Sequence, residues 1–214
     1  MEILKGLPVA QAINEELIKE SQEAGIKPHL AIIRVGERPD DCSYERGATK
    51  KMDKVGFDCT SYVFPQDITD EEFQKEFDKI NKDDNIDGIL LLRPLPKHIN
   101  EKAIEERINP VKDLDGISPV NLAKVYAGDV NGFAPCTAEA VIEMLDYAGI
   151  DLTGKRVTVV GRSLVIGKPV AMMLMKKNAT VTVCHTKTKD MAGTCRNAEV
   201  LVAAAGSAKM IKPD

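Results

Sequence analysis

The sequence has 214 residues, which is enough for one large domain or two small ones. Hydrophobic residues make up 43% and charged residues 29%, values typical of a globular protein rather than a disordered one. The net charge of −4, without a basic stripe, argues against nucleic acid as the main partner. No apolar run reaches the roughly 18 residues of a membrane-spanning helix, and the first residues lack the apolar core of a signal peptide. We therefore expect a cytoplasmic protein without a membrane partner.

The cysteines give the same indication about the compartment. There are five, an odd number, and none forms a C-x-x-C pair: Cys42, Cys59, Cys136, Cys184 and Cys195. This pattern is typical of reduced thiols and not of a disulfide framework or a zinc site. The sequence therefore predicts no metal.

Strand-like apolar segments alternate with helical ones along the chain. The expected elements are, in order, a helix over 8–24, a strand over 30–35, a helix over 42–55, a strand over 60–64, a helix capped by Thr69 and running to about 80, a strand over 88–92, helices from 100 and from 119, a helix over 137–148 that Thr137 could cap, a strand over 156–160, a helix over 167–177, and strands over 180–184 and 199–204. Alternation of this kind predicts βαβ units and parallel sheets, an α/β fold. Pattern alone places a domain boundary between residues 120 and 150.

The segment from Gly161 to Pro169 reads as strand, turn and helix. Glycine lets the backbone approach a phosphate closely, and the N-terminus of the following helix offers free N–H groups and a positive dipole end. The motif differs from the dinucleotide pattern G-x-G-x-x-G, because Arg162 and Ser163 follow the first glycine and the next glycine is Gly167. A tight strand-to-helix turn without a ligand explains the glycines as well. Arg162 favours a phosphate, because a guanidinium suits that group.

Five groups of residues in order resemble one family across essentially the whole chain. They are Asp87-Gly88-Ile89 with Pro94-Leu95-Pro96, Lys112-Asp113-Leu114-Asp115-Gly116, Pro135-Cys136-Thr137, Gly161-Arg162-Ser163 with Gly167 and Pro169, and the run from Ala179 to Thr188. Their order and spacing resemble the methylenetetrahydrofolate dehydrogenase/methenyltetrahydrofolate cyclohydrolase family. The resemblance implies an N-terminal folate-binding catalytic domain over 1–120, a Rossmann-like NAD(P)-binding domain over 121–214, a cleft between them, and a homodimer.

The resemblance also assigns residues to the cofactor half. It implies that Gly161, Arg162, Ser163, Gly167 and Thr186 bind the dinucleotide, with Thr186 near the adenosine ribose. Arg162 and Thr186, together with the lysine that follows Thr186, favour NADP, with NAD as the alternative. The histidine at 185 is interpreted as a structural residue at a strand end, and its neighbour Cys184 as part of the core.

In the folate half the family carries a helix with the pattern Y-x-x-x-K and a strand with the pattern V-Q-L-P-L-P. Tyr44 matches the tyrosine, but Ala48 stands at the lysine and Leu92 at the glutamine. Asp115 matches the third polar group. The resemblance implies that Tyr44 and Asp115 are catalytic and that Tyr44, Leu92, Pro94 and Asp115 contact a tetrahydrofolate derivative. The alternatives are that Tyr44 is a half-buried helix residue, and that the acids at 113 and 115 are loop-solvating groups or helix caps.

The two departures bear unequally on the family's two reactions. Hydride transfer to a nicotinamide needs two faces held together and no protein base at the carbon. Hydrolysis of the methenyl product needs a positioned and deprotonated water, which a lysine–glutamine pair could assist. We therefore hypothesise a dehydrogenase with weakened or absent cyclohydrolase activity.

Other interpretations stay open. Arg93 or Lys51 could supply the missing cation, although Lys51 is two turns beyond Tyr44 and Arg93 would point to the opposite side of a regular strand. The chain could be an inactive relative that binds folate or nucleotide without turnover. A non-folate Rossmann oxidoreductase or a nucleotide-binding regulatory module would require the folate-half motifs to match by chance.

The family continues beyond the position where this sequence ends. It adds another strand, a Pro-Gly-Gly loop and a terminal helix after the segment that matches residues 206–214. We therefore expect a C-terminally truncated cofactor domain with an exposed sheet edge, and a chain that binds its ligands poorly as given.

Overall fold

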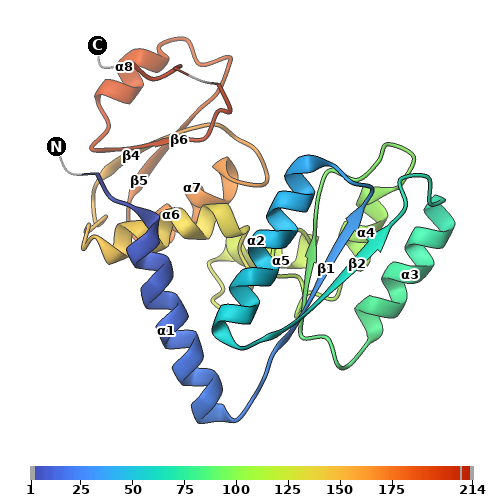
Figure 1. The fold of residues 1–214 in the computed structure, drawn as a ribbon. Helices are drawn as coiled ribbons and strands as arrows, with labels where there is room; N and C mark the ends of the chain where they lie inside the picture. Colours follow the sequence, from blue (N-terminus) through green and yellow to red (C-terminus); the bar gives the residue numbers. More distant parts are fainter. Residues whose placement is uncertain (1–2, 208, 213–214) are drawn as a thin grey trace. The chain divides into compact units, whose positions relative to one another are not determined.

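The structure, a computed structural model, describes residues 3–207 and 209–212. It divides into two compact units, one over residues 5–121 and one that begins at residue 122 and also takes in residues 3–4. Each unit contains a three-stranded parallel sheet with helices against it (Figure 1). Two expectations concern segments that lie partly outside the described ranges: the lack of a signal peptide at the N-terminus and the truncation of the cofactor domain at the C-terminus.

The first unit follows the predicted alternation. Its elements are α1 (Gly6–Ala24), β1 (His29–Val35), α2 (Pro39–Val55), β2 (Asp58–Phe64), α3 (Asp70–Lys82), β3 (Gly88–Leu91) and α4 (Glu101–Arg107), and α5 (Pro119–Ala127) spans the boundary to the second unit. The strand order is β2-β1-β3, with His29 paired to Asp58 and Leu30 to Gly88. After β1 the chain forms β2 on one side of β1 and later β3 on the other side. The carboxyl end of β1 is therefore a topological switch point, where ligands of parallel sheets bind.

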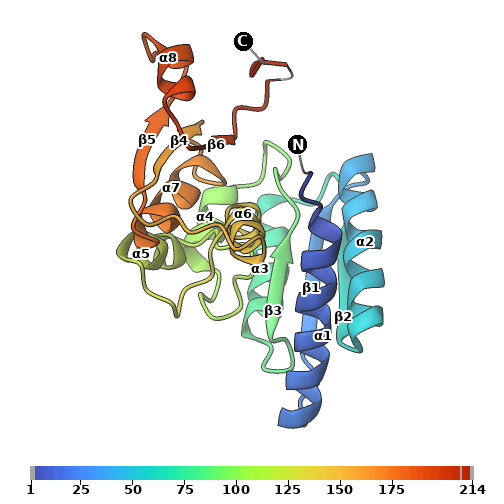
Figure 2. The same cartoon turned by 90° about the vertical axis from the view of Figure 1, so that its left-hand side faces the viewer.

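Both faces of β1 are buried, because its side chains alternate between two apolar clusters. Ala31, Ile33 and Val35 lie in a large core with the aromatic residues of α3, whereas Leu30 and Ile32 lie in a smaller cluster toward α2. Figure 2 shows α2 and α3 on opposite sides of this sheet. The sheet is thus a layer between helices, as the continuous apolar run in β1 predicts.

Helix starts follow the local polar chemistry. Thr69 caps α3 in a capping box with Glu72, which confirms the predicted start. The expected start of α2 at Cys42 is wrong, since the helix begins three residues earlier. Pro39 takes a first-turn position and Asp40 follows it, a combination that suits the positive end of the helix dipole.

The second unit repeats the same topology. Its elements are α6 (Cys136–Tyr147), β4 (Arg156–Val160), α7 (Gly167–Lys176), β5 (Thr180–Cys184), α8 (Met191–Arg196) and β6 (Val200–Ala203). The strand order is β5-β4-β6, so the carboxyl end of β4 is again a switch point. Val157 and Val159 pack toward α6 and α7, and the Thr158 hydroxyl between them donates to the Thr194 carbonyl of α8 on the other face.

Two sequence expectations fail in this unit. Thr137 does not cap α6, because Pro135 occupies the N-cap position and the helix starts at Cys136. The short helix α8 was not expected, since six residues are too few for a periodic pattern. Its signal is Asp190, whose carboxylate accepts a 2.9 Å hydrogen bond from the Gly193 N–H. Among the described residues, no helix is both long and apolar enough to cross a membrane.

Candidate active site

The predicted nucleotide turn joins β4 to α7 at the switch point of the second sheet. Gly161 has φ +131°, and a Cβ there would lie 2.4 Å from the Ala204 carbonyl oxygen, so only glycine fits. A Cβ on Gly167 would lie 2.3 Å from the Gly161 oxygen. The Gly161 N–H donates to the Cys184 carbonyl at 2.9 Å. The glycines therefore bring the start of α7 against the strand ends, whether or not a ligand is bound.

Ser163 organises the first turn of α7. Its hydroxyl oxygen accepts hydrogen bonds from the N–H groups of Ile166 at 3.1 Å and Gly167 at 3.4 Å. A hydroxyl oxygen thus already occupies the position where a helix N-terminus receives an anion. Arg162 and Ser163 are both exposed at this turn. The turn combines a strand end without a Cβ and a helix N-terminus, which suit a dinucleotide pyrophosphate, with an exposed guanidinium, which suits a phosphate group.

Thr186 lies next to this turn, because it follows β5, the strand paired with β4. The register places Val160 opposite Cys184, and Thr186 is exposed two residues later. His185 makes turn contacts: its N–H donates to the Thr188 hydroxyl at 2.9 Å, and its Nδ1 accepts from the Lys187 N–H at 3.1 Å. The interpretation of His185 as structural fits these contacts, and Cys184 is fully buried as expected.

The predicted folate residues of the first unit lie on α2, on the segment after β3 and on the segment over 112–116. Tyr44 lies on α2 with 56% of its surface exposed. The beginning of α2 is tied to the segment after β3, since Arg38 Nη1 donates to the Pro94 carbonyl at 2.8 Å. Arg38 also forms a 3.2 Å ion pair with Asp41. Sequence reasoning missed Arg38, although an arginine directly before a helix with an acidic first turn was a usable signal.

Ala48 and Leu92 lie in the same apolar cluster. Leu92 is 8% exposed and its N–H donates to the Ile33 carbonyl at 2.9 Å, an extension of the ladder beyond β3. The other members are Leu30, Ile32, Met52, Cys59, Leu90 and Leu114. Burial raises the pKa of the Cys59 thiol, as an apolar environment should. The two positions where the family pattern has lysine and glutamine are thus filled by packed hydrocarbon.

Neither alternative cation takes the lysine's place. Lys51 Nζ donates to the Asn14 side chain of α1 at 3.3 Å. The alternation of a regular strand predicts that Arg93 points to the opposite side from Leu92, and the contacts agree: Leu92 packs in the cluster with α2, whereas Arg93 meets Glu101 and Glu105 of α4. Its guanidinium also forms an ion pair with Asp115 at 3.7 Å between Nη2 and Oδ2.

The two acids of the 112–116 segment have different environments. Asp113 is fully buried, and its carboxylate accepts hydrogen bonds from the N–H groups of Ile117 at 2.9 Å and Ser118 at 2.8 Å and from the Asn121 amide at 2.9 Å. It therefore holds its own loop together. The Asp115 side chain is 27% exposed. Of the two, Asp115 is the one whose carboxylate a ligand could reach.

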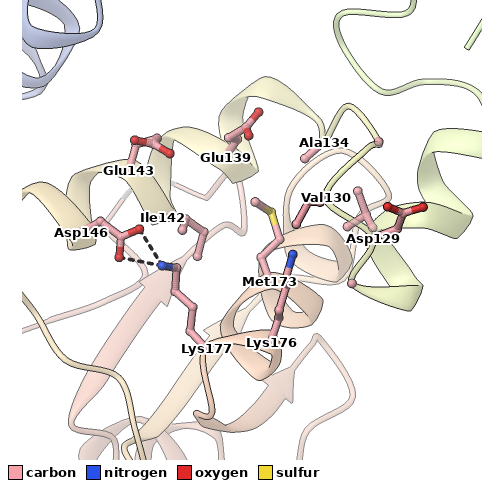
Figure 3. A pocket seen from close by; sticks show the side chains of 13 residues that line it. Asp129, Val130, Ala134, Glu139, Ile142, Glu143, Asp146, Met173, Lys176 and Lys177 are labelled. Carbon is pink, nitrogen blue, oxygen red and sulfur yellow. Dashed lines mark hydrogen bonds and ion pairs between the residues drawn. The ribbon is translucent and has the colours of Figure 1, made fainter. Parts of the chain in front are cut away.

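A separate pocket of about 370 Å³ lies in the second unit between α6, α7 and the loop over 128–134 (Figure 3). Burial and the neighbouring Glu143 raise the pKa of Glu139 on its rim. Lys177 Nζ forms contacts of 2.6 Å and 2.8 Å with the two carboxylate oxygens of Asp146. None of the predicted site residues lines this pocket, so it is distinct from both switch points.

Two family models match the chain. The model of the tetrahydrofolate dehydrogenase/cyclohydrolase catalytic domain covers residues 4–115, and that of the NAD(P)-binding domain of the same enzymes covers residues 135–214. The chain belongs to the tetrahydrofolate dehydrogenase/cyclohydrolase family. The resemblance seen in the sequence and the expected α/β fold with two parallel sheets are confirmed, and so is the dinucleotide class of cofactor.

Relatives of the family are similar over nearly the whole chain. The bifunctional protein FolD of Clostridioides difficile is 51% identical over 213 residues, which cover 98% of this chain and 74% of the relative. That of Clostridium kluyveri is 49% identical over 98% of this chain and 75% of its own length. This member of the tetrahydrofolate dehydrogenase/cyclohydrolase family thus spans about three quarters of the length of these relatives.

Solved structures of the tetrahydrofolate dehydrogenase/cyclohydrolase family have the same fold. The bifunctional FolD methylenetetrahydrofolate dehydrogenase/cyclohydrolase of Campylobacter jejuni is 36% identical, with a TM-score of 0.95 over 99% of this chain and 76% of that one. The FolD of Trypanosoma brucei, complexed with NADP cofactor and an inhibitor, is also 36% identical, with a TM-score of 0.88 over 96% and 72% of the two chains.

Proposed function

We propose that this protein is an NADP-dependent methylenetetrahydrofolate dehydrogenase whose methenyltetrahydrofolate cyclohydrolase activity is weakened or absent. It oxidises 5,10-methylenetetrahydrofolate to 5,10-methenyltetrahydrofolate. The observation that carries this proposal is the apolar cluster around Ala48 and Leu92, where the family pattern has a lysine and a glutamine. The nucleotide turn at Gly161, in contrast, keeps each residue type that a dinucleotide requires.

The dehydrogenase step makes modest demands on the protein. NADP⁺ bound at the Gly161 turn would supply the hydride acceptor, so that oxidation of the methylene carbon to the methenyl cation would be balanced by reduction of NADP⁺ to NADPH. The protein's part is to bind and orient the two reactants. We assign the pyrophosphate to the turn at Gly161, Ser163 and Gly167, the additional phosphate of NADP to Arg162, and the adenosine ribose to the Thr186 hydroxyl.

The folate is assigned to the switch point of the first sheet. Asp115 is suited to accept two parallel hydrogen bonds from the amino-pyrimidine ring of a pterin. Tyr44 presents its ring at the exposed side of α2, and we place it against the one-carbon unit. Leu92 and Pro94 supply apolar contact beside it.

The cyclohydrolase step requires more than these residues offer. A water must lose a proton as it attacks the methenyl carbon, and neither alanine nor leucine can accept or stabilise that charge. Arg93 cannot act as a base because a guanidinium stays protonated in proteins. Lys51 is engaged with Asn14. The packed apolar cluster also disfavours a bound water, which needs at least two polar partners.

The larger organisation is part of the same proposal. We assign folate binding to residues 1–120 and NADP binding to residues 121–214, with support from the two compact units and the two matched family models. A homodimer in the cytoplasm is proposed from the family resemblance. The molecular mass of the purified chain, measured by light scattering, tests the dimer. A monomer at micromolar concentration would contradict it.

Ligand binding and turnover on the purified chain test the function. We expect NADP to raise the melting temperature more than NAD does, because a ligand stabilises the state that binds it. Mixing with 5,10-methylenetetrahydrofolate should then reduce NADP. Binding of both ligands without NADPH formation would contradict the proposal and identify an inactive relative.

A further inference from the structure

Arg93 occupies the position where the family pattern has the leucine after the glutamine. Its guanidinium lies among three carboxylates from two other segments. Nη1 lies 3.0 Å from Glu105 and 3.6 Å from Glu101, both on α4, and Nη2 lies 3.7 Å from Asp115. All four side chains are 20–30% exposed, so these ion pairs are only weakly screened by solvent.

The two ends of the guanidinium have different partners. The glutamates are four residues apart on one face of α4 and both meet Nη1. Glu101 is itself held, because its Oε2 accepts a 2.7 Å hydrogen bond from the Leu95 N–H. Burial raises the pKa of Glu105, and the positive charge of Arg93 opposes that rise. The helix thus fixes one edge of the guanidinium and aims the other edge at Asp115.

This arrangement costs stability. The Arg93 Nε atom is buried, and it has no hydrogen-bond partner within the described ranges of the chain. Leaving a buried donor unpaired is unfavourable, and a partly buried ion cluster repays little of its desolvation. An arginine here is therefore poorly explained as a device for stability alone, and its contact with Asp115 offers a functional reason.

We propose that Arg93 is a positioning residue for folate binding, which holds the Asp115 carboxylate so that it can accept both hydrogen bonds of the pterin ring. Glu105 in turn holds Arg93. Without the guanidinium, the carboxylates of Glu101, Glu105 and Asp115 would face one another uncompensated, and repulsion would displace the most mobile of them. The inference rests on the proposed role of Asp115 in binding folate.

Calorimetric titration of the full chain with tetrahydrofolate tests the inference. We expect Arg93→Met, of similar length but without charge, to weaken binding by about 10-fold, and Arg93→Lys to recover part of this loss. In an Asp115→Asn background, Arg93→Met should cause little further loss, because its effect passes through Asp115. The matched control is Arg107→Gln, which removes a different ion pair of α4, the 3.4 Å pair between Arg107 and Asp78. This variant should leave the affinity for tetrahydrofolate unchanged.

The outcomes separate the two proposals. A wild-type chain that does not bind tetrahydrofolate would overturn the proposed function, and this inference with it. Wild-type binding that Arg93→Met leaves intact, or losses that simply add in the double variant, would overturn this inference alone. If Arg93→Met fails to fold, Arg93→Lys and Glu105→Gln still decide, because each should weaken tetrahydrofolate binding and leave NADP binding unchanged.

Discussion

Ala48 on α2 and Leu92 after β3 pack into one apolar cluster of the first unit. The two departures from the family pattern are therefore a single physical change: a polar pair is absent from one place and hydrocarbon fills it. A lone polar substitution there would leave a buried group without its partner. This explains how both positions can differ from the family pattern together while the fold around them is kept.

Restoring the pair should restore hydrolysis. We expect the double variant Ala48→Lys/Leu92→Gln to hydrolyse methenyltetrahydrofolate about 100-fold faster than the parent chain, the lower end of what a positioned acid–base group contributes. Each single variant should gain much less. The measurement is the disappearance of added methenyltetrahydrofolate above its spontaneous rate.

The matched control for this prediction is Met52→Lys. Met52 lies one turn beyond Ala48 in the same cluster and is also partly buried, so its substitution also introduces a partly buried amine. We expect it to lower stability by about 1–3 kcal/mol without gaining hydrolysis. Equal gains in Met52→Lys and the double variant would show that a nearby cation suffices and that the lysine–glutamine geometry does not matter.

Gly161→Ala should abolish the nucleotide turn. The new Cβ would meet the Ala204 oxygen at 2.4 Å, at a φ of +131° that other residues rarely adopt. We expect NADP affinity to fall at least 10-fold and the free energy of unfolding to fall by about 1–3 kcal/mol. Gly154→Ala is the control, because it shares a positive φ of +72° but meets no atom within 4 Å. Titration with NADP showing equal effects in the two variants would argue against the site.

Removing the guanidinium at 162 should change cofactor preference. We expect Arg162→Ala to weaken NADP binding about 10-fold or more and to change NAD binding less, since NADP carries an additional phosphate for the arginine to pair with. Titration of both cofactors on the same preparation measures the ratio. A parallel loss for NADP and NAD would place Arg162 at the shared pyrophosphate instead.

The decrease of the free energy of unfolding at acid pH should depend on Asp70. Hydrogen bonds from the Asn100 N–H at 2.8 Å and the Gln74 amide at 3.0 Å lower the pKa of this carboxyl from its ordinary value of 3.8. Its stabilisation is therefore present above about pH 4 and is lost as the pH falls through the lowered pKa. Asp70→Asn should be less stable than the parent at pH 7, and this difference should shrink below pH 4.

Urea unfolding at several pH values checks this prediction. Asp84→Asn, a change at an exposed carboxylate that follows α3, serves as the comparison and should have little effect at either pH. A constant gap between Asp70→Asn and the parent from pH 7 to pH 3 would contradict the assignment.

Local signals in the sequence predict much of this fold. The apolar run of β1 and the capping residue Thr69 predict elements that the structure contains. Gly161 lies where the Ala204 backbone leaves no room for a Cβ. The apolar spacing predicts the start of α2 three residues too late, because Pro39 precedes the periodic part of the helix. Each of these depends on chemistry within a few residues.

Contacts between distant segments could not be predicted in this way. The alternation of a regular strand predicts on which side of the strand Arg93 lies, but it does not predict which carboxylates Arg93 meets there. The glutamates that meet Arg93 lie on a helix whose orientation the sequence does not encode locally. The same holds for the packing of Ala48 with Leu92, which needed the register of β1 and β3.

The most direct test of the central claim follows both products in one reaction. Purified protein is mixed with NADP and 5,10-methylenetetrahydrofolate, and NADPH and methenyltetrahydrofolate are measured together over time. We expect methenyltetrahydrofolate to accumulate in step with NADPH and to decay at, or little above, its spontaneous rate. Formation of NADPH with methenyltetrahydrofolate held low by rapid conversion to the formyl product would contradict the central claim.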